Sequence, residues 1–446
     1  MLPPEVADLL NNIGGYLSPI LLPAWRFLKD WWWVPLPFIL WKPFLFLWHW
    51  WRVDIWLNKV YRPTLFEIKI PRDNLKPIRA MEEVMNSIHA IIYHPPDWWE
   101  YWIDGQLQTS ISLEIVSLGG EIHFYIRIHK AYKDAVEAAI YSQFPEAEIT
   151  QAEDYTKLVP HDIPNKEWDL FGSSYEPIRE DWYPIKTYTT FETESEALEE
   201  KRVDPVSALL EALAKIKPEE QLWFQFGIEP TSNEKGQSVG EWLKKGEEFR
   251  DKLAKRKEKP QAKPMAQEAA DLFFTGKIPG EEEEVKEEAF PPEMRLTPGE
   301  KDIVTAIERK MSKLLFTTYI RFIYLGKKSV WYKPNFRLAF SFFSQYETMN
   351  MNSMFPTGKT ITKIHQHWFW PIDALRPRRY YMRRRRLFRQ YVDRLSPYFP
   401  EPGGTFMLNT EEVASLFHFP SWIVSPVPGV SRIDAKKGPA PDLLNK

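Results

Sequence analysis

The 446-residue chain contains no cysteine. This absence excludes disulfide bonds, thiolate nucleophiles, cysteine-ligated zinc and iron–sulfur clusters, and it fits a reducing compartment. The sequence also lacks the Gly-x-Ser-x-Gly elbow of hydrolases, a glycine-rich dinucleotide fingerprint and the His-Glu-x-x-His zinc motif. We therefore expect no catalytic residue, no metal ligand and no bound cofactor, and we interpret the chain as a non-enzyme.

Two short motifs are incomplete versions of a phosphate-binding loop and of a metal site. Segment 356–360 ends like a phosphate-binding loop, but Ser353 stands where that loop needs a glycine. His365 and His367 would lie on one face of a strand and could grip a metal, yet no third ligand is near them in the sequence. We predict neither nucleotide hydrolysis nor a metal site. Scattered carboxylates are interpreted as parts of exposed faces, among them Glu67, Glu114 and Glu137.

The sequence also has no large net charge. Its net charge of −3 implies no global attraction to nucleic acid. The charge is nevertheless uneven: residues 280–288 are acidic, whereas residues 376–394 hold nine arginines interleaved with four aromatic residues. Guanidinium groups bind phosphates bidentately, and aromatic faces stack on bases or lie among lipid headgroups.

The arginine cluster is therefore predicted to bind an anionic ligand, and its nature stays open between lipid, nucleic acid and an acidic protein. A solvated helix whose arginines pair with local acids is the plainer alternative. The residues predicted to contact the ligand are Arg378, Arg379, Arg383, Arg384, Arg385, Arg386 and Arg389.

Tryptophan is concentrated near the N-terminus, where nine of the 20 lie between Trp25 and Trp56. Its ring has an apolar body and one N–H donor, so tryptophan prefers the boundary between membrane and water. The alternative is a Trp-rich core element or a protein interface. The residues predicted to contact the membrane are Trp31, Trp32, Trp33, Trp41, Trp48, Trp50 and Trp51.

Whether this segment spans the bilayer is left open by its prolines. Pro35, Pro37 and Pro43 each remove a backbone donor and are expected to kink or break a helix. An interfacial element suits them at least as well as a spanning helix, which needs about 20 mostly apolar residues. Nearby cations could reach lipid phosphates while their stems stay in apolar surroundings, as for Arg26, Lys29, Lys42 and Arg52.

After Pro63 the hydrophobic pattern predicts a compact set of alternating strands and helices. Gly119-Gly120 between two alternating runs predicts a hairpin, because a tight turn needs positive φ. The order is β-α-β-β-α-β, which is the ferredoxin-like arrangement. The predicted elements are a strand at 65–70, a helix at 78–92, strands at 111–115 and 122–128, a helix at 132–143 and a strand at 147–151.

A second copy of that order follows, stretched by a charged insertion at about 230–298 that is expected to be a mobile linker with one helix at 239–257. Asp204-Pro205 predicts a helix start, and Thr297 with Glu300 predicts a capping box. The predicted elements are a strand at 184–191, a helix at 204–216, strands at 221–228 and 314–324, a helix at 335–349 and a closing strand at 361–369.

The predicted fold class is accordingly α+β, with two tandem ferredoxin-like units behind a Trp-rich membrane-associating segment. We predict four parts with these boundaries: 1–61 for the Trp-rich segment, 62–158 and 159–400 for the two ferredoxin-like domains, and 401–446 for a C-terminal segment.

Several stretches resemble the amino-terminal, non-motor region of coupling-protein-like type IV secretion and conjugation ATPases of candidate-phylum bacteria, over most of residues 62–440. In that family a Walker-type motor domain follows the segment that matches Phe417 to Pro420, whereas this chain ends at Lys446. The resemblance therefore implies that the motor is a separate chain or that this chain is cut before it. The matching stretches are 65–72, 80–82, 113–127, 221–223, 321–325 and 408–420.

From the Trp-rich segment and this resemblance we expect a membrane-associated structural or docking component of a type IV secretion-like or DNA-translocation apparatus. Its expected partners are the membrane, a separate motor ATPase and other secretion components, with the bulk of the chain on the cytoplasmic side. The alternative is a nucleic-acid-binding adaptor that uses the arginine cluster Arg376–Arg394. Nucleic acid as a partner and oligomerisation are left open.

Overall fold

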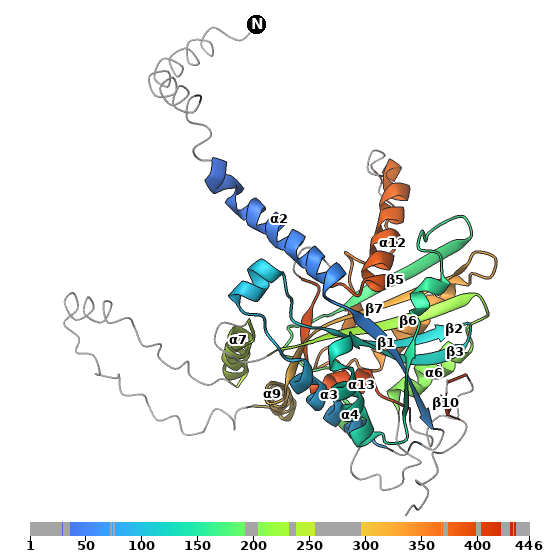
Figure 1. Cartoon of the computed structure of the whole chain (residues 1–446). Coiled ribbons are helices and arrows are strands. Elements are labelled where there is room, and N and C mark those ends of the chain that lie inside the picture. The colour runs from blue at the N-terminus through green and yellow to red at the C-terminus, as the bar shows by residue number, and fades with distance from the viewer. Residues whose placement is uncertain are drawn as a thin grey trace, which may run out of the picture. The chain divides into compact units, whose positions relative to one another are not determined.

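The described residues of the computed structural model form two compact units (Figure 1). The aromatic unit comprises Met1–Arg62 with Pro95–Leu107, and the sheet unit comprises Pro63–His94 with Gln108–Lys446. Within these bounds the structure describes residues 29, 36–71, 74, 76–191, 204–231, 238–254, 296–366, 368, 373–397, 403–420, 429–430 and 432–433.

The aromatic unit is built on one long helix, α2 (Leu36–Lys59), and a π-helical turn at Glu100–Asp104. Of the expected effects of the prolines, a break is wrong for Pro43, because α2 continues through this residue. Pro37 lies in its first turn, where the missing N–H would have no partner within the helix and proline is tolerated.

The sheet unit has the predicted α+β class and contains one sheet, whose strands run in the order β10-β1-β3-β2-β6-β7-β5-β8, with β4 on β1 and β9 on β7. Every pairing is antiparallel except that of β1 with β10. The strands are β1 (Pro63–Pro71), β2 (Ile111–Leu118), β3 (Glu121–His129), β4 (Glu148–Ala152), β5 (Trp168–Pro177), β6 (Glu220–Pro230), β7 (Leu315–Lys327), β8 (Met354–Pro356), β9 (Phe406–Asn409) and β10 (Arg432–Ile433).

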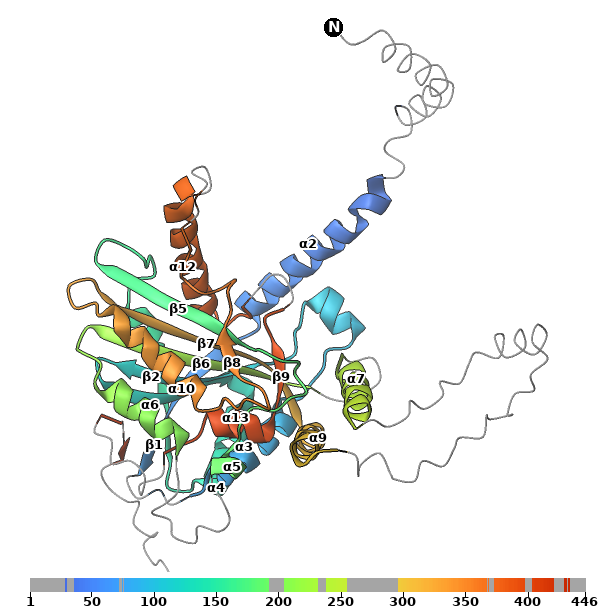
Figure 2. The same cartoon turned by 180° about the vertical axis from the view of Figure 1, so that it is seen from behind.

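Helices cover one face of this sheet, and Figure 2 shows α6 and α10 lying across it. The main hydrophobic core lies between that face and five helices, α3, α4, α6, α10 and α13. The helices of the sheet unit are α3 (Ile78–Ile92), α4 (Lys133–Gln143), α5 (Tyr188–Phe191), α6 (Pro205–Ala214), α7 (Ser238–Leu253), α9 (Pro298–Met311), α10 (Arg337–Ser344), α12 (Arg376–Val392) and α13 (Thr410–Leu416).

The opposite face of the sheet is covered by the C-terminal half of α12 and by residues 155–163. Leu387, Phe388 and Tyr391 of α12 pack there against strand residues such as Trp223 and Ile323. Because both faces are covered, the central strands are buried on both sides and read as nearly continuous apolar runs.

Local sequence signals explain two helix starts and one turn. Gly119 and Gly120 have φ of 63° and 99°, as the predicted hairpin requires. The side chain of Asp204 accepts hydrogen bonds from the first N–H groups of α6, and Thr297 forms the predicted capping box of α9. These predicted features are confirmed.

Three predicted elements of the second half are wrong in position. The strand predicted at 184–191 is β5 at Trp168–Pro177 instead, and 188–191 forms the helical turn α5. The closing strand predicted at 361–369 is the three-residue β8, and the described residues between 361 and 368 contain no strand. The helix predicted at 335–349 is shorter: α10 spans Arg337–Ser344 and follows a 3-10 turn at Lys333–Phe336. The sequence did not predict β5 because most of this strand is buried on both faces, so its residues do not alternate between apolar and polar.

Candidate functional site

The exposed surface of α2 is dominated by large apolar side chains. Four consecutive residues, 38–41, are exposed, and at 100° per residue they reach all sides of the helix. A helix that is apolar on every side normally lies in a core or a membrane. The exposed apolar residues of α2 are Leu36, Phe38, Ile39, Leu40, Trp41, Phe44, Phe46, Leu47, Trp50 and Trp51.

The predicted membrane residues are divided between this surface and the unplaced part of the chain. Trp41, Trp50 and Trp51 are exposed and Trp48 is half-buried. Within the described residues, no helix combines the length and the apolar character needed to cross a membrane. The remaining predicted residues lie outside the described part of the chain, namely Trp31, Trp32 and Trp33.

A second aromatic segment, residues 95–105, is fastened to α2. Trp48 Nε1 donates a hydrogen bond to the carbonyl of Trp102, with 3.0 Å between the two atoms, and Arg52 Nε donates to the carbonyl of Ile103. Just before this contact, Trp98 and Trp99 are 67% and 60% exposed. The aromatic unit therefore presents exposed tryptophan from two segments of the chain, and the second was not predicted from the sequence.

Ring stacking and a close backbone approach complete the attachment. The rings of His49 and Tyr101 stack with their centroids 4.2 Å apart, and burial lowers the pKa of His49. Gly105 has φ of +71°, and a Cβ at this position would lie 2.3–2.6 Å from backbone atoms of Arg52 and Val53. Only glycine fits a position with both constraints.

We expect Gly105→Ala to loosen residues 95–105 from α2 without affecting the sheet unit. The positive φ alone costs about 1–3 kcal/mol in a residue with a side chain, so amide hydrogen exchange in residues 100–106 should accelerate by about tenfold or more. Gly240→Ala is the matched control, because a Cβ there meets nothing within 4 Å. Unchanged exchange in Gly105→Ala would contradict this account of the attachment.

The arginine cluster lies mainly on α12, whose N-terminal half extends away from the sheet (Figure 1). Its arginines fall into two groups. Arg378, Arg379, Arg386 and Arg389 are exposed, as binding to an external anion requires. Arg383, Arg384 and Arg385 are half-buried and contact the protein itself.

Arg384 and Arg385 attach α12 to the sheet unit. Arg384 forms an ion pair with Asp169 of β5, and its guanidinium carbon lies 3.8 Å from the centroid of the Tyr380 ring. Arg385 donates to the backbone carbonyl of His161. These two arginines already have protein partners, so an external anion would have to compete for them.

Arg383 holds the segment that resembles a phosphate-binding loop. Its Nη1 donates to the carbonyls of Gly358, Ile361 and Lys363 at 3.2–3.3 Å. Residues 357–360 form a turn, and the Thr360 hydroxyl accepts a hydrogen bond from a backbone N–H of β5. This segment is therefore hydrogen-bonded to the backbone of β5 and stabilises that side of the sheet.

The histidines at 365 and 367 form no metal site that the structure describes. His365 is exposed, and His367 lies outside the described residues. Within the described part of the chain, no group of three or more His, Asp or Glu side chains is placed to hold a metal ion.

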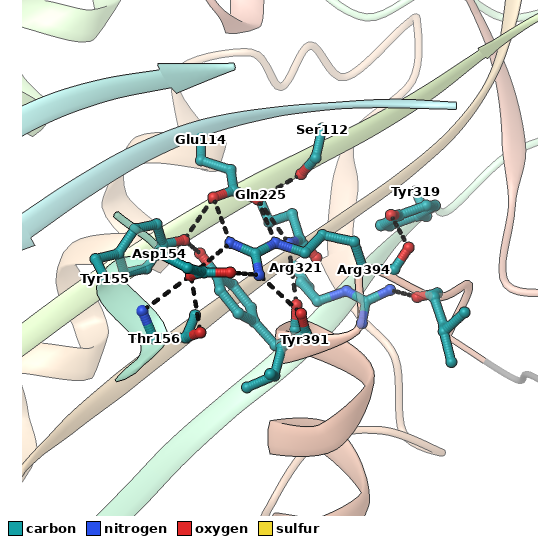
Figure 3. A network of polar contacts seen from close by, with 12 residues as sticks. Ser112, Glu114, Asp154, Tyr155, Thr156, Gln225, Tyr319, Arg321, Tyr391 and Arg394 are labelled. Carbon is teal, nitrogen blue, oxygen red and sulfur yellow. Dashed lines mark hydrogen bonds and ion pairs between the residues drawn. The ribbon is translucent and has the colours of Figure 1, made fainter. Parts of the chain in front are cut away.

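A buried ionic network joins the C-terminal end of α12 to the sheet (Figure 3). Arg394 Nε lies 3.0 Å from Glu114 Oε1, and its Nη1 lies 2.7 Å from Asp154 Oδ2. The Tyr155 hydroxyl donates to Glu114 Oε2 at 2.7 Å and lies 2.8 Å from the hydroxyl of Tyr391. The expectation that Glu114 belongs to an exposed face is wrong, because its exposed fraction is 0%.

Neighbouring polar residues add further hydrogen bonds to Glu114. Ser112 Oγ donates to Glu114 Oε1 at 2.6 Å, and Gln225 Nε2 donates to the same atom at 3.0 Å. Arg321 is fully buried beside them, donates to the carbonyl of Leu395, and has its pKa lowered to about 10 by burial. Burying several charged groups costs free energy unless they are paired, so this cluster is a strong constraint on the fold.

The pKa values of the two carboxyls show which effect dominates. Burial alone would raise the pKa of Glu114, but the charge of Arg394 and hydrogen bonds from Arg394, Ser112 and Tyr155 outweigh it and lower the pKa. Burial likewise opposes ionisation of Asp154, and Arg394 again lowers its pKa. Both groups are therefore carboxylates at neutral pH. Glu114 is fully buried and Asp154 is partly exposed. Both carboxylates are already hydrogen-bonded within the protein, so their arrangement fits a structural role.

Comparison with known proteins adds a family. No curated protein matches this chain. A family model described as a domain of unknown function (DUF8128) matches residues 57–425, which include most of the sheet unit, the 95–105 segment and the last turn of α2. The chain belongs to the DUF8128 family.

Proposed function

We propose that this chain is a non-enzymatic, membrane-associated docking component of a type IV secretion-like or DNA-translocation apparatus that works with a separate motor ATPase. The observation that carries the membrane part is the exposed tryptophan and phenylalanine surface of the aromatic unit, on α2 and at Trp98 and Trp99. The apparatus and the motor rest on the resemblance of residues 62–440 to coupling-protein-like ATPases.

A bilayer interface suits this surface better than water does. Exposed apolar area costs about 25 cal/mol per Å², and large apolar patches on soluble proteins mark interaction sites. Tryptophan rings favour headgroup depth, and Lys42, Arg52 and Lys59 on α2 offer positive charge to lipid phosphates. The same helix would hold the sheet unit on the cytoplasmic side of the membrane.

We propose further that the sheet consists of two ferredoxin-like units joined edge to edge. The first half has the strand order β4-β1-β3-β2 and the second has β8-β5-β7-β6. The first follows the chain order β-α-β-β-α-β, and the second follows it with α7 and α9 inserted between β6 and β7. Strands β2 and β6 pair across the junction, for example Leu113 with Phe226. Such a double unit gives a broad, rigid surface for partners of the apparatus.

The test is flotation of the full chain with vesicles that contain anionic phosphatidylglycerol. We expect the wild-type chain to float, and the triple variant Trp41→Gln, Trp50→Gln and Trp51→Gln to bind about a hundredfold more weakly. Each ring is exposed in the free protein, so its removal costs membrane contact of more than about 1 kcal/mol without disturbing a core.

The matched control replaces three similarly exposed apolar residues of the sheet unit, namely Leu158, Ile178 and Phe355, with glutamine. This control should float like the wild type. A wild-type chain that stays with the soluble fraction would contradict membrane association and favour a Trp-rich protein interface.

The alternative function, a nucleic-acid-binding adaptor that uses Arg376–Arg394, keeps one supporting observation. Arg378 and Arg379 are exposed on the half of α12 that extends from the sheet. Binding through them would be salt-dependent and independent of sequence, because phosphate contacts release counterions.

A further inference from the structure

A large cleft lies in the sheet unit between the start of α12, the start of α10 and residues 361–364. Its volume is about 860 Å³, near the upper end of the range for ligand sites. Four cationic side chains line it, from Lys333, Arg337, Lys363 and Arg376. Among the described residues that line the cleft, none is acidic. The cleft is therefore a concentration of positive charge in a chain whose net charge is negative.

Aromatic rings accompany these cations in the cleft. Phe336 and Tyr380 both contribute to its lining and are only half-buried. The Phe336 ring packs against Phe171 of β5, which also lines the cleft, with the two centroids 4.3 Å apart. A ring fixed in this way is a platform on which a planar group can stack at little cost in side-chain entropy.

The walls of the cleft are held by contacts already described. Arg383 binds the carbonyls of Ile361 and Lys363, and Thr362 N–H donates to the carbonyl of Gly172 in β5 at 3.0 Å. The wall that presents Lys363 is thus fixed to the sheet on one side and to α12 on the other. A preformed cleft loses less entropy on binding than a loop that must order.

We propose that this cleft binds a short stretch of single-stranded nucleic acid, with phosphates on the four cations and a base on the Phe336 ring. Cationic grooves with aromatic platforms are the recurring solution for single strands, because every base has a face that can stack. A simple anion would use the cations but leave the rings without a role, and a duplex hides its bases in the stack. The cleft shares Arg376 with the arginine cluster, but its other three cations lie outside α12. Binding in the cleft does not depend on membrane association, so either proposal can fail alone.

Binding is tested with the full chain in detergent micelles and a fluorescein-labelled thymidine dodecamer. We expect the triple variant Lys333→Gln, Arg337→Gln and Lys363→Gln to bind at least about tenfold more weakly at physiological salt. The slope of log K against log salt should also become shallower by about 2, since each phosphate contact with a single strand contributes about 0.7. All three side chains are exposed, so their replacement should leave the fold intact.

Two control variants separate the cleft from charge in general. Lys244→Gln, Lys245→Gln and Lys301→Gln remove the same charge from exposed positions of α7 and α9 and should bind like the wild type. Arg378→Gln with Arg379→Gln tests the outer face of α12. If either control loses as much affinity as the cleft variant, or if the cleft variant binds normally, the proposed site is overturned.

A second arm tests the base platform. The wild-type chain should bind the thymidine dodecamer about tenfold more tightly than an abasic dodecamer with the same phosphates, and Phe336→Leu should largely remove that preference. Leucine keeps apolar contact with Phe171, and the unfolding transition of the variant shows whether the fold is retained. If the wild type binds both dodecamers with equal affinity, the nucleic-acid assignment is overturned in favour of an anion site. The same conclusion follows if anionic vesicles displace the dodecamers with equal affinity.

Discussion

Replacing Arg394 with leucine is expected to lower the free energy of unfolding of the sheet unit by about 3–5 kcal/mol. The change leaves the Glu114 carboxylate buried without its main partner and removes the ion pair with Asp154. Removing one member of a buried pair costs far more than the pair itself contributes, because the remaining charge has lost both water and partner. Urea unfolding followed by fluorescence measures this loss.

Arg389→Gln is the matched control, because Arg389 is exposed on α12, five residues before Arg394. Its replacement should change the free energy of unfolding by no more than about 0.5 kcal/mol. Arg394→Lys should fall between the two, since lysine keeps the charge but cannot make the forked contacts. A loss below about 1 kcal/mol in Arg394→Leu would show that the network is not a constraint on the fold.

The pairing of Arg394 with Glu114 and Asp154 also makes the free energy of unfolding depend on pH, and the pKa shifts fix the direction of this dependence. In the wild type, the folded pKa values of Glu114 and Asp154 are lowered, so their contribution is present above the unfolded pKa values of about 4 and is lost as pH falls through the folded ones. In Arg394→Leu, the buried Glu114 loses the group that lowers its pKa. The variant should therefore gain stability relative to wild type as pH falls from 7 to 5.

This network shows where sequence reasoning stops. Glu114 and Arg394 are 280 residues apart, so no spacing or period brings them together. Glu114 was interpreted as an exposed carboxylate because polar residues in a half-buried strand normally face water. Residues 111–115 alternate between apolar and polar side chains, which predicts one solvent face, whereas β2 is buried on both faces.

The first half of the sheet unit was easier to predict than the second for a physical reason. There, strands such as β1 and the hairpin at Gly119-Gly120 carry clear alternation and turn residues, and each lies at its predicted place. In the second half, β5 is mostly buried on both faces and β8 is only three residues long, so neither has a period to detect.

The exposed tryptophans of the aromatic unit were predicted in part. The tryptophans of α2 were predicted to contact a membrane because they lie close together in the sequence. Trp98 and Trp99 begin a short helical turn that lies between α3 and β2 in the sequence. The contacts of residues 101–105 with α2 assign this turn to the aromatic unit. A helical turn of this length is too short to carry a periodic signal of its own.

A second buried ion pair should respond unequally to removal of its two members. Lys310 of α9 lies 3.1 Å from Glu412. Glu412 also accepts the N–H of Asn409 in the capping box of α13, and the N–H of Ile185 from a distant segment. We expect Glu412→Ala to lower the free energy of unfolding by about 3–5 kcal/mol, because it leaves a buried ammonium and removes the cap.

Lys310→Met should cost less, because the remaining carboxyl can take up a proton. Neutralising a glutamate at pH 7 costs at most about 3.7 kcal/mol, against about 4.6 for a lysine, from their ordinary pKa values. Burial already raises the pKa of Glu412 even beside Lys310, and it also raises that of Asp181, which faces the same ammonium.

The sign of the pH dependence distinguishes this account from simple loss of packing. In Lys310→Met the folded pKa values of Glu412 and Asp181 lie above the unfolded ones, so stability should be highest near pH 4 and fall as pH rises through the folded values. Methionine fills the space of the lysine stem, and packing by itself does not change with pH. A cost for Lys310→Met that is equal to that of Glu412→Ala and constant from pH 5 to 8 would show that the carboxyls stay charged, and the argument from burial would then be wrong.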